Sequence, residues 1–371
     1  MRRYFGLLSG IAMGLFLMAA PAAYGQQEGD TPPTDLSKVG TSAANFLKLP
    51  VGARALALGG GGVATVKDAT ALYWNPAGIG ALDRMTLAYN RSQLYAGITH
   101  TFTGFILPMG LNTRLGVSYI GLDSGEMEVT TVDEPDGTGE FFSVLNTSIG
   151  LTISQIMTDR FTLGITGKWI QERIQRAVAN GVALDVGSTF NTGLLGTRLG
   201  MAILNMGPKM SLSGPDLEFT RQIDEEPGEI TAGLNPDATL GTLEYDIPLM
   251  FRMGVSIDLL GGISTFMAND QNRVTALVDI EDANDQVARL GVSFEYAWNE
   301  MVYARFGYRV RGKLSDQLGD RLAGRYREQF TMGYGLGLTT DVGGYAVQLD
   351  YGIADYADLG SVSQFFLSFG F

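Results

Sequence analysis

The chain has 371 residues, of which 26 are lysine or arginine and 39 are aspartate or glutamate, so its formal net charge is −13. No basic stripe offsets phosphate charge in so acidic a chain, which excludes nucleic acid as an expected partner. Because it has no cysteine and one histidine, His100, it lacks the residues of disulfides, cysteine zinc sites and multi-histidine metal sites, and we expect no cofactor, no metal and no enzymatic activity.

Residues 1–25 have the pattern of a secretory signal peptide. Arg2 and Arg3 form a basic start, an apolar run extends from Phe5 to Ala20, and small residues around Tyr24 make a cleavage site. An uncleaved membrane anchor is the alternative, but the run is shorter than the roughly 20 residues that a spanning helix needs. Cleavage removes two arginines and no acid, so the formal charge goes from −13 to −15.

The next two segments are predicted to be a lead-in and a plug. Residues 26–42 are polar and contain prolines, which indicates a flexible periplasmic lead-in. Residues 43–83 are rich in small residues and poor in charge, and we expect them to form a compact plug inside a barrel, with a short helix over Ala53–Leu58. The expected plug motif consists of Gly52, Arg54, Gly59, Gly60, Asn75, Pro76 and Gly78. Its glycines permit positive φ, and Pro76 biases Asn75 away from helix.

From residue 84 to residue 371 the hydrophobic pattern has period two. In residues 289–298, for example, the apolar and aromatic side chains are Leu290, Val292, Phe294, Tyr296 and Trp298, and the positions between them are polar or small. Such alternation places one face of each strand against an apolar medium. A soluble β-sandwich also alternates, but the small, mixed polar face and the aromatics at the ends of the apolar face favour an all-β transmembrane antiparallel barrel.

The strand count and the connections support the barrel. Candidate strands start near residues 84, 97, 113, 143, 160, 178, 196, 247, 272, 287, 301, 327, 343 and 362. Fourteen is an even number, as bacterial single-chain barrels require. The three longest connections, 123–142, 207–246 and 312–326, all follow odd-numbered strands, and short turns follow most even-numbered ones. This asymmetry predicts an integral outer-membrane protein in contact with lipid, with long loops outside and a periplasmic N-terminus.

The last strand has a terminal aromatic pattern. Phe369 and Phe371 are predicted to point outward, and the ending resembles the signal that hands outer-membrane barrels to the barrel-assembly machinery. Most charged residues at inward positions are expected to pair across the lumen, with binding of the plug and lining of a path as the alternatives. Those positions are Lys168, Asp185, Arg198, Arg252, Asp258, Arg273, Asp279, Arg289, Glu295, Arg305, Arg309 and Asp350. Acidic residues at 133–140 and 224–226 are expected to be solvated loops, with calcium binding in the first as the alternative.

Several motifs resemble one protein family. The segment from Gly52 to Gly60, followed by Trp74-Asn75-Pro76-Ala77-Gly78, is similar to the PorV/PorQ family, which belongs to the wider group of FadL-like outer-membrane barrels. The segments 305–309, 348–352 and 369–371 resemble it more weakly. The motif around Asn75 is also shared with true FadL transporters, so it indicates the superfamily better than the function.

The resemblance implies a fourteen-stranded barrel with an N-terminal hatch. Members like PorV act in type IX secretion, so the implied partners are secreted cargo proteins and other secretion subunits, bound through the three long loops. The alternative is a FadL-like passive transporter of hydrophobic small molecules, which an apolar channel beside the plug, or a strand kinked at Gly333, Gly335 and Gly337, would favour. A barrel hydrolase that uses His100 is a third reading.

Overall fold

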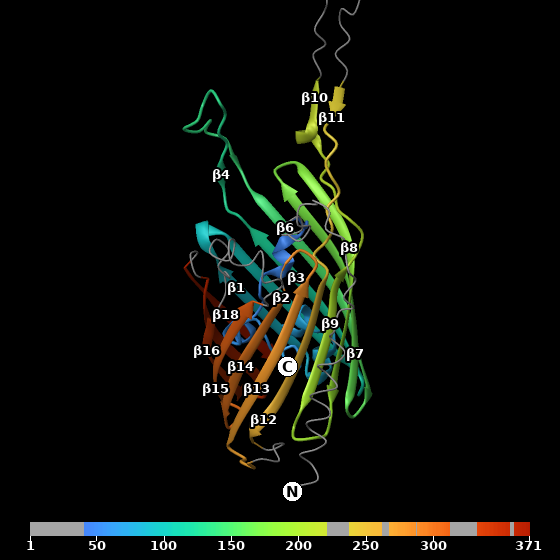
Figure 1. Cartoon of the computed structure of the whole chain (residues 1–371), viewed down its shortest axis with the longest axis vertical. Helices are drawn as coiled ribbons and strands as arrows, with labels where there is room; N and C mark the ends of the chain where they lie inside the picture. The colour runs from blue at the N-terminus through green and yellow to red at the C-terminus, as the bar shows by residue number, and fades with distance from the viewer. Residues whose placement is uncertain (1–40, 221–236, 262–266, 287, 312–331, 357–359) are drawn as a thin grey trace, which may run out of the picture. The chain divides into compact units, whose positions relative to one another are not determined.

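The wall of the molecule forms where the sequence alternates. A computed structural model describes residues 41–220, 237–261, 267–286, 288–311, 332–356 and 360–371. Fourteen antiparallel strands close into a barrel in which β18 pairs with β1, from Thr86 opposite Gly370 to Gln93 opposite Ser363 (Figure 1). The closed, all-β barrel of fourteen antiparallel strands that the sequence predicts is confirmed. Closure pairs the two chain-terminal strands with each other and so removes the free edges of an open sheet.

The barrel strands lie within a few residues of their predicted starts; the one predicted from residue 327 is described from Met332, because 327–331 lie outside the described residues. Their bounds are β1 (Thr86–Gln93), β2 (Thr99–Met109), β3 (Thr113–Asp123), β6 (Val144–Thr158), β7 (Phe161–Ile174), β8 (Ala177–Asn191), β9 (Arg198–Met206), β12 (Met250–Leu260), β13 (Asn272–Ala283), β14 (Arg289–Trp298), β15 (Val302–Arg311), β16 (Met332–Val342), β17 (Tyr345–Asp355) and β18 (Ser361–Gly370).

The remaining elements are short. Two hairpins, β4 (Met127–Glu128) with β5 (Phe141–Phe142) and β10 (Glu218–Thr220) with β11 (Asp237–Thr239), belong to long connections. The helices are η2 (Asn45–Lys48), α2 (Ala53–Ala57), α3 (Ala71–Trp74), η3 (Pro76–Ala81), η4 (Tyr95–Gly97) and η5 (Pro215–Leu217). None of the helices in the described residues is long and apolar enough to cross a membrane.

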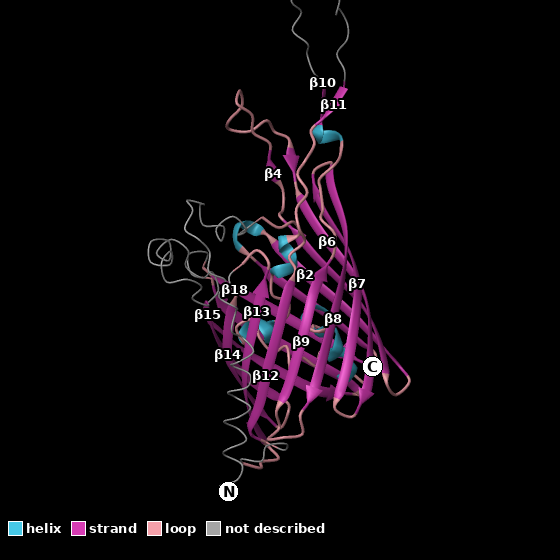
Figure 2. Ribbon diagram, turned by 45° about the vertical axis from the view of Figure 1, so that its right-hand side comes forward, coloured by secondary structure: helices cyan, strands magenta, loops and turns pink. Residues whose placement is uncertain are grey.

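The barrel has two different ends. At the short-turn end the connections are 110–112, 159–160, 192–197, 261–271, 299–301 and 343–344. At the long-loop end they are 94–98, 124–143, 175–176, 207–249, 284–288, 312–331 and 356–360. Figure 2 shows the β4–β5 and β10–β11 hairpins extending beyond the rim at the long-loop end. The longest connections therefore share one end, as the sequence predicts.

Side chains alternate between the two faces of the wall. In β18 the burial pattern alternates strictly over most of its length, with Phe365 and Phe369 exposed and Gln364 and Phe366 buried. The exposed face is a belt of apolar and aromatic side chains, and the buried face lines the lumen. Residues 41–82, which contain η2, α2, α3 and η3, are largely buried against that inner face.

Candidate functional site

The plug can lie close to the wall because the facing wall residues are glycines. A Cβ on Gly307 would overlap the Leu58 carbonyl carbon, one on Gly333 would overlap the Leu56 oxygen, and one on Gly164 would overlap the Pro76 carbonyl carbon. β16 pairs with β17 along its whole length without a register shift, so its glycines do not kink the wall. Gly333 instead lets the backbone of α2 approach the strand, and Gly335 leaves room for the Ala57 side chain.

The glycine turn after α2 is held by two charged wall residues. Gly59, Gly60 and Gly62 have φ of 72°, 74° and 102°, the left-handed region that favours glycine. The turn presents the N–H groups of Gly62 and Val63 to the Asp279 carboxylate at 2.9 and 3.1 Å. Arg309 donates to the Gly60 carbonyl at 3.2 Å. The backbone of this turn therefore anchors the plug on one acidic and one basic side chain of the wall.

Asn75 and Pro76 connect the plug to another part of the wall. Asn75 is extended, with φ −162° and ψ 104°, as the following proline favours. Its Oδ1 accepts from the Ala77 N–H at 3.2 Å and caps η3, and its Nδ2 donates to the carbonyls of Val63 and Ser188 at 3.1 and 3.0 Å. One side chain thus joins two plug segments to β8.

Glu295 is the centre of the largest charge network. It accepts from Arg54 of the plug and from Arg305 of β15, both at 2.9 Å, and it pairs with Arg273 at 3.3 Å. Arg305 also pairs with Asp350 at 2.5 Å, so the network extends to β17. Glu295 and Arg305 each have more than one partner of opposite charge, so the network joins the plug electrostatically to β13, β14, β15 and β17.

Arg252 forms a second network. It is 1% exposed, and its guanidinium lies 4.2 Å from the Trp74 ring centroid and 4.8 Å from that of Tyr73. Its Nε pairs with Glu281 at 2.8 Å. Cation–π contact and ion pairing together compensate this buried charge.

The other predicted lumen charges also have partners. Lys168 pairs with Asp185 at 2.6 Å and donates to Asn205 at 2.8 Å, and Arg198 pairs with Asp258. Arg289 and Arg309 both approach Glu281, at 3.5 and 3.8 Å. The inward charges of the described strands therefore act mainly as cross-links within the lumen.

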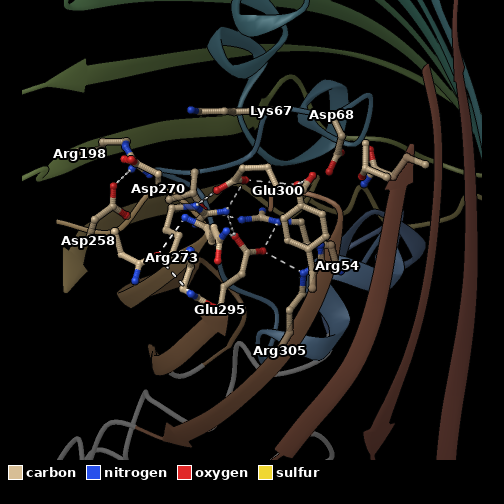
Figure 3. Close-up of a pocket in the computed structure, with 17 residues that line it drawn as sticks. Arg54, Lys67, Asp68, Arg198, Asp258, Asp270, Arg273, Glu295, Glu300 and Arg305 are labelled. Carbon is tan, nitrogen blue, oxygen red and sulfur yellow. Dashed lines mark hydrogen bonds and ion pairs between the residues drawn. The ribbon is translucent and has the colours of Figure 1, made fainter. Parts of the chain in front are cut away.

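A polar pocket of about 560 Å³ lies between the plug and the wall, next to connections of the short-turn end (Figure 3). Arg54, Thr65, Lys67 and Asp68 line it from the plug, and wall residues of β9, β12–β17 and two turns complete it. Its arginines are paired. Lys67 extends toward the pocket and has no hydrogen bond or ion pair among the described residues. Burial and then the charges of Arg198, Arg273 and Arg54 lower the pKa of Lys67.

Glu300, in the turn between β14 and β15, forms part of the pocket rim. Arg273 Nε donates to its Oε1 at 2.6 Å. This hydrogen bond stabilises the ionised carboxylate and lowers the pKa of Glu300. The rim of the pocket is therefore held by an ion pair that titrates only in acid.

Near the long-loop end the lumen has two different sides. The charges of Arg252, Glu281, Arg289 and Arg309 lie on β12–β15, whereas the side formed by β18, β1, β2 and β3 is largely apolar and is called here the apolar half. There Phe46 and Leu47, 3% and 1% exposed, pack in one cluster with Phe102, Ile120 and Phe366 of the wall. The segment of residues 41–51 has only one turn of 3₁₀ helix, and that turn has no side-chain cap. Tyr73 Oη donates to the Leu47 carbonyl at 3.0 Å, and Trp74 Nε1 donates to the Val51 carbonyl at 2.7 Å.

The start of this segment lies at the long-loop end. The Ala43 N–H donates to the Asp246 carbonyl at 3.0 Å, and Lys48 pairs with Asp285 at 2.5 Å. Both partners belong to connections of the long-loop end. The sequence predicts the lead-in and the long loops on opposite sides of the membrane, yet residues 41 and 42 of the lead-in stand at the same end as those loops. The apolar side chains of 43–51 explain this, because they fill the apolar half of the lumen.

The remaining residues predicted from the sequence include glycines of the plug and phenylalanines on the outer face of the barrel. Gly52 has φ 93° and donates to Asn90 Oδ1 at 3.3 Å, and a Cβ on Gly78 would lie 2.6 Å from the Val66 oxygen. Phe369 and Phe371 are exposed, and Phe371 contacts Tyr345 edge-on at 5.9 Å. The acidic residues at 133–140 form no metal-binding group among the described residues. Residues 224–226 lie outside them.

Sequence reasoning overlooked two features of the lumen. Lys67 could have been noticed as one of the few charges in a nearly uncharged segment. Three polar wall residues, Ser92, His100 and Gln364, form one group, but only strand register brings them together. Neither feature has a motif of its own.

The fold has relatives among solved structures. The chain matches the toluene transporter TodX of Pseudomonas putida with a TM-score of 0.52 and 12% identity, over 86% of this chain and 97% of that one. It matches the toluene transporter TbuX of Ralstonia pickettii with a TM-score of 0.50 and 13% identity, over 86% and 97%. The monoaromatic hydrocarbon channel CymD matches with a TM-score of 0.50 and 12% identity, over 88% and 97%.

At this level of identity the similarity shows the fold alone. No protein-family model matches the chain, and no curated protein matches it. The similarity to the PorV/PorQ family therefore stays a prediction from the sequence motifs, while the closed fourteen-strand fold is shared with these three barrels.

Proposed function

We propose that this chain is an outer-membrane barrel through which small hydrophobic molecules pass passively, and that residues 41–51 are the part that moves. The observation that carries the proposal is the apolar half of the lumen, which is occupied by a short segment of the chain itself. Phe46 and Leu47 lie there among wall residues that would equally suit an apolar ligand. The apolar outer belt and the signal-peptide pattern support the location.

The contacts of the segment suit a movable element. Only one turn of its backbone is helical. Apart from the apolar packing of side chains such as Phe46 and Leu47, it is attached by single hydrogen bonds and by one ion pair at the rim. The rest of the plug, by contrast, is fixed by the glycine contacts and by the Glu295 and Arg252 networks. Movement of residues 41–51 would therefore open the apolar half while the plug body stays in place.

A disulfide across the rim tests the proposal. The natural chain has no cysteine, and Ala43 and Asp246 are joined by a backbone hydrogen bond, so Ala43→Cys with Asp246→Cys places one new pair of thiols there. Uptake of radiolabelled octane by cells that produce the oxidised double variant should fall to that of cells without the protein. Reduction should restore it, and each single variant should behave as wild type. Uptake by the oxidised variant at the wild-type rate would make the proposal wrong.

Binding of secreted cargo, as in type IX secretion, is the second candidate. It is favoured by the two hairpins that project from the long-loop end and by the acidic residues of the first, including Glu126, Glu128 and Glu134. Removal of residues 127–142 would then abolish co-purification of secreted proteins and leave octane uptake unchanged. Loss of neither activity would exclude a role for that hairpin in cargo binding.

A further inference from the structure

The apolar half of the lumen contains one row of polar wall residues. Gln364 of β18 is in register with Ser92 of β1, and Ser92 is in register with His100 of β2. Leu122 of β3 follows His100 in the row, and Asn146 of β6 follows Leu122. Directly opposed residues have Cβ atoms about 5 Å apart. We call Asn146, His100, Ser92 and Gln364 the polar row.

The polar row has hydrogen-bonding capacity that the described residues leave unused. Ser92 is 0% exposed, His100 1% and Gln364 2%. Within the described part of the chain, Ser92 Oγ, both ring nitrogens of His100, Gln364 Oε1 and Asn146 Oδ1 have no hydrogen-bond partner. A buried polar atom without a partner costs about 1–3 kcal/mol, so five in one row call for a physical cause.

The surroundings of the row suit a molecule with an apolar body. One step closer to the short-turn end, Phe102 and Phe366 both pair with Asn90 and face the lumen, 0% and 1% exposed. Residues 49–51 of the movable segment lie against the row, because Gln364 Nε2 donates to the Pro50 carbonyl at 2.8 Å. The row thus adjoins both the apolar cluster and the segment that the proposed function sets in motion.

We propose that the polar row binds the hydroxyl group of an apolar alcohol or phenol, whose body packs on Phe102 and Phe366 after residues 49–51 have moved. The inference rests on the proposed function and adds a substrate class to it. A hydroxyl group both donates and accepts, which matches the acceptor Oε1 of Gln364 together with a serine hydroxyl and an imidazole that do both. A hydrocarbon leaves all these atoms unpaired. A carboxylate brings a charge to a row that has no lysine or arginine.

Three probes with the same chain length test the head group: octane, octanol and octanoate. Trp74 reports binding, since it belongs to the same apolar cluster. The other two tryptophans, Trp169 and Trp298, are exposed on the outer face and are replaced by phenylalanine. In this background we expect octanol to bind purified protein about tenfold more tightly than octane, and octanoate to bind more weakly than octanol.

The variants Ser92→Ala and His100→Leu should lose the preference for octanol without loss of thermal stability, because each removes unpaired buried polar atoms. Ser293→Ala is the matched control: Ser293 is equally buried and its Oγ has no partner among the described residues, but it lies on β14, away from the row. It should keep the preference. Partition into the detergent micelle is common to all variants and cancels in the comparison.

Equal binding of octanol and octane by the wild type would overturn the inference and leave the row as a site for buried water only. A preference for octanoate over octanol would overturn the assignment of a hydroxyl head group. A preference for octanol that survives both Ser92→Ala and His100→Leu would overturn the location of the hydroxyl-binding site at the polar row. If cells take up octane but the purified protein shows no preference for octanol, the inference about the polar row is refuted and the proposed transport stands. If the purified protein prefers octanol but cells take up no octane, the proposed transport is refuted and the binding site stands.

Discussion

At the scale of single residues, the lumen shows how buried charge is made tolerable. Glu295 is 4% exposed and has three arginine partners, one of which, Arg54, belongs to the plug. An isolated carboxylate could not remain ionised in such surroundings, and it is the convergence of guanidinium groups that keeps it so. Alternation in the sequence places Glu295, Arg273 and Arg305 on the inner face of the wall, whereas their pairing, and the contact with Arg54, depends on which elements are neighbours.

Replacement of Glu295 by alanine should therefore destabilise the protein strongly. Arg54 and Arg305 would each lose a buried partner, and breaking a buried pair costs about 3–5 kcal/mol. Thermal unfolding in detergent measures the effect. The exposed pair Arg84–Asp341, at 3.1 Å, provides the control, because Arg84→Ala should cost less than about 1 kcal/mol. Equal losses in both variants would contradict the role of Glu295.

The pair of Arg273 and Glu300 makes stability depend on pH. The hydrogen bond from Arg273 lowers the pKa of Glu300 in the folded state, so the stabilisation is complete above the ordinary pKa of a glutamate and is lost as the pH falls through the lowered value. Wild type should be more stable than Glu300→Gln at neutral pH, and the difference should shrink in acid. Unfolding of both proteins across that range measures it, and a difference that grows in acid would contradict the assignment.

At the scale of elements, the plug is held by complementary shape. Its helices have only four to six residues each, and such short helices have little stability of their own. The plug therefore depends on the wall, where glycines allow its backbone to approach and charged side chains bind its turns.

Two glycines of β7 allow a matched test of this dependence. Gly164→Ala places a methyl group against the carbonyl carbon of Pro76, whereas Gly167 has no atom within 4 Å of a Cβ. Gly164→Ala should displace η3 and raise the ion conductance of the protein in planar bilayers, and Gly167→Ala should leave it at the wild-type level. Unchanged conductance in both variants would show that the plug does not depend on this contact.

At the scale of the whole molecule, the difference between the two ends predicts the orientation. Val132 in a long connection is 99% exposed and Leu111 in a short turn is 90% exposed. A cysteine at position 132 should react with a membrane-impermeant maleimide on intact cells, and a cysteine at position 111 should react only after the outer membrane is opened. The natural chain contributes no competing thiol. We therefore expect the long-loop end to face the outside of the cell. Labelling on intact cells at position 111 alone would show the opposite orientation.

The wall was predictable because its signal is local. In β14 the alternation of Leu290, Val292 and Phe294 with Gly291 and Ser293 indicates which side chains face outward. The other strands can be interpreted in the same way, one at a time, without knowledge of which strands they pair with. Asn75-Pro76 and the four glycines also act locally, through φ. The polar pocket and the polar row were not predictable in this way, because Lys67, Glu295 and Arg198, or Ser92 and Gln364, meet only when the barrel closes.

The sequence by itself determined a closed barrel of fourteen strands, the inward and outward faces of its wall and the end at which the long connections lie, because period, turn residues and connection length are properties of short stretches of chain. Only the tertiary structure decided that residues 41–51 fill the apolar half of the lumen from the long-loop end and that Arg54 meets Glu295. Those contacts join residues far apart in the chain, and their energies depend on a geometry that closure of the barrel alone creates.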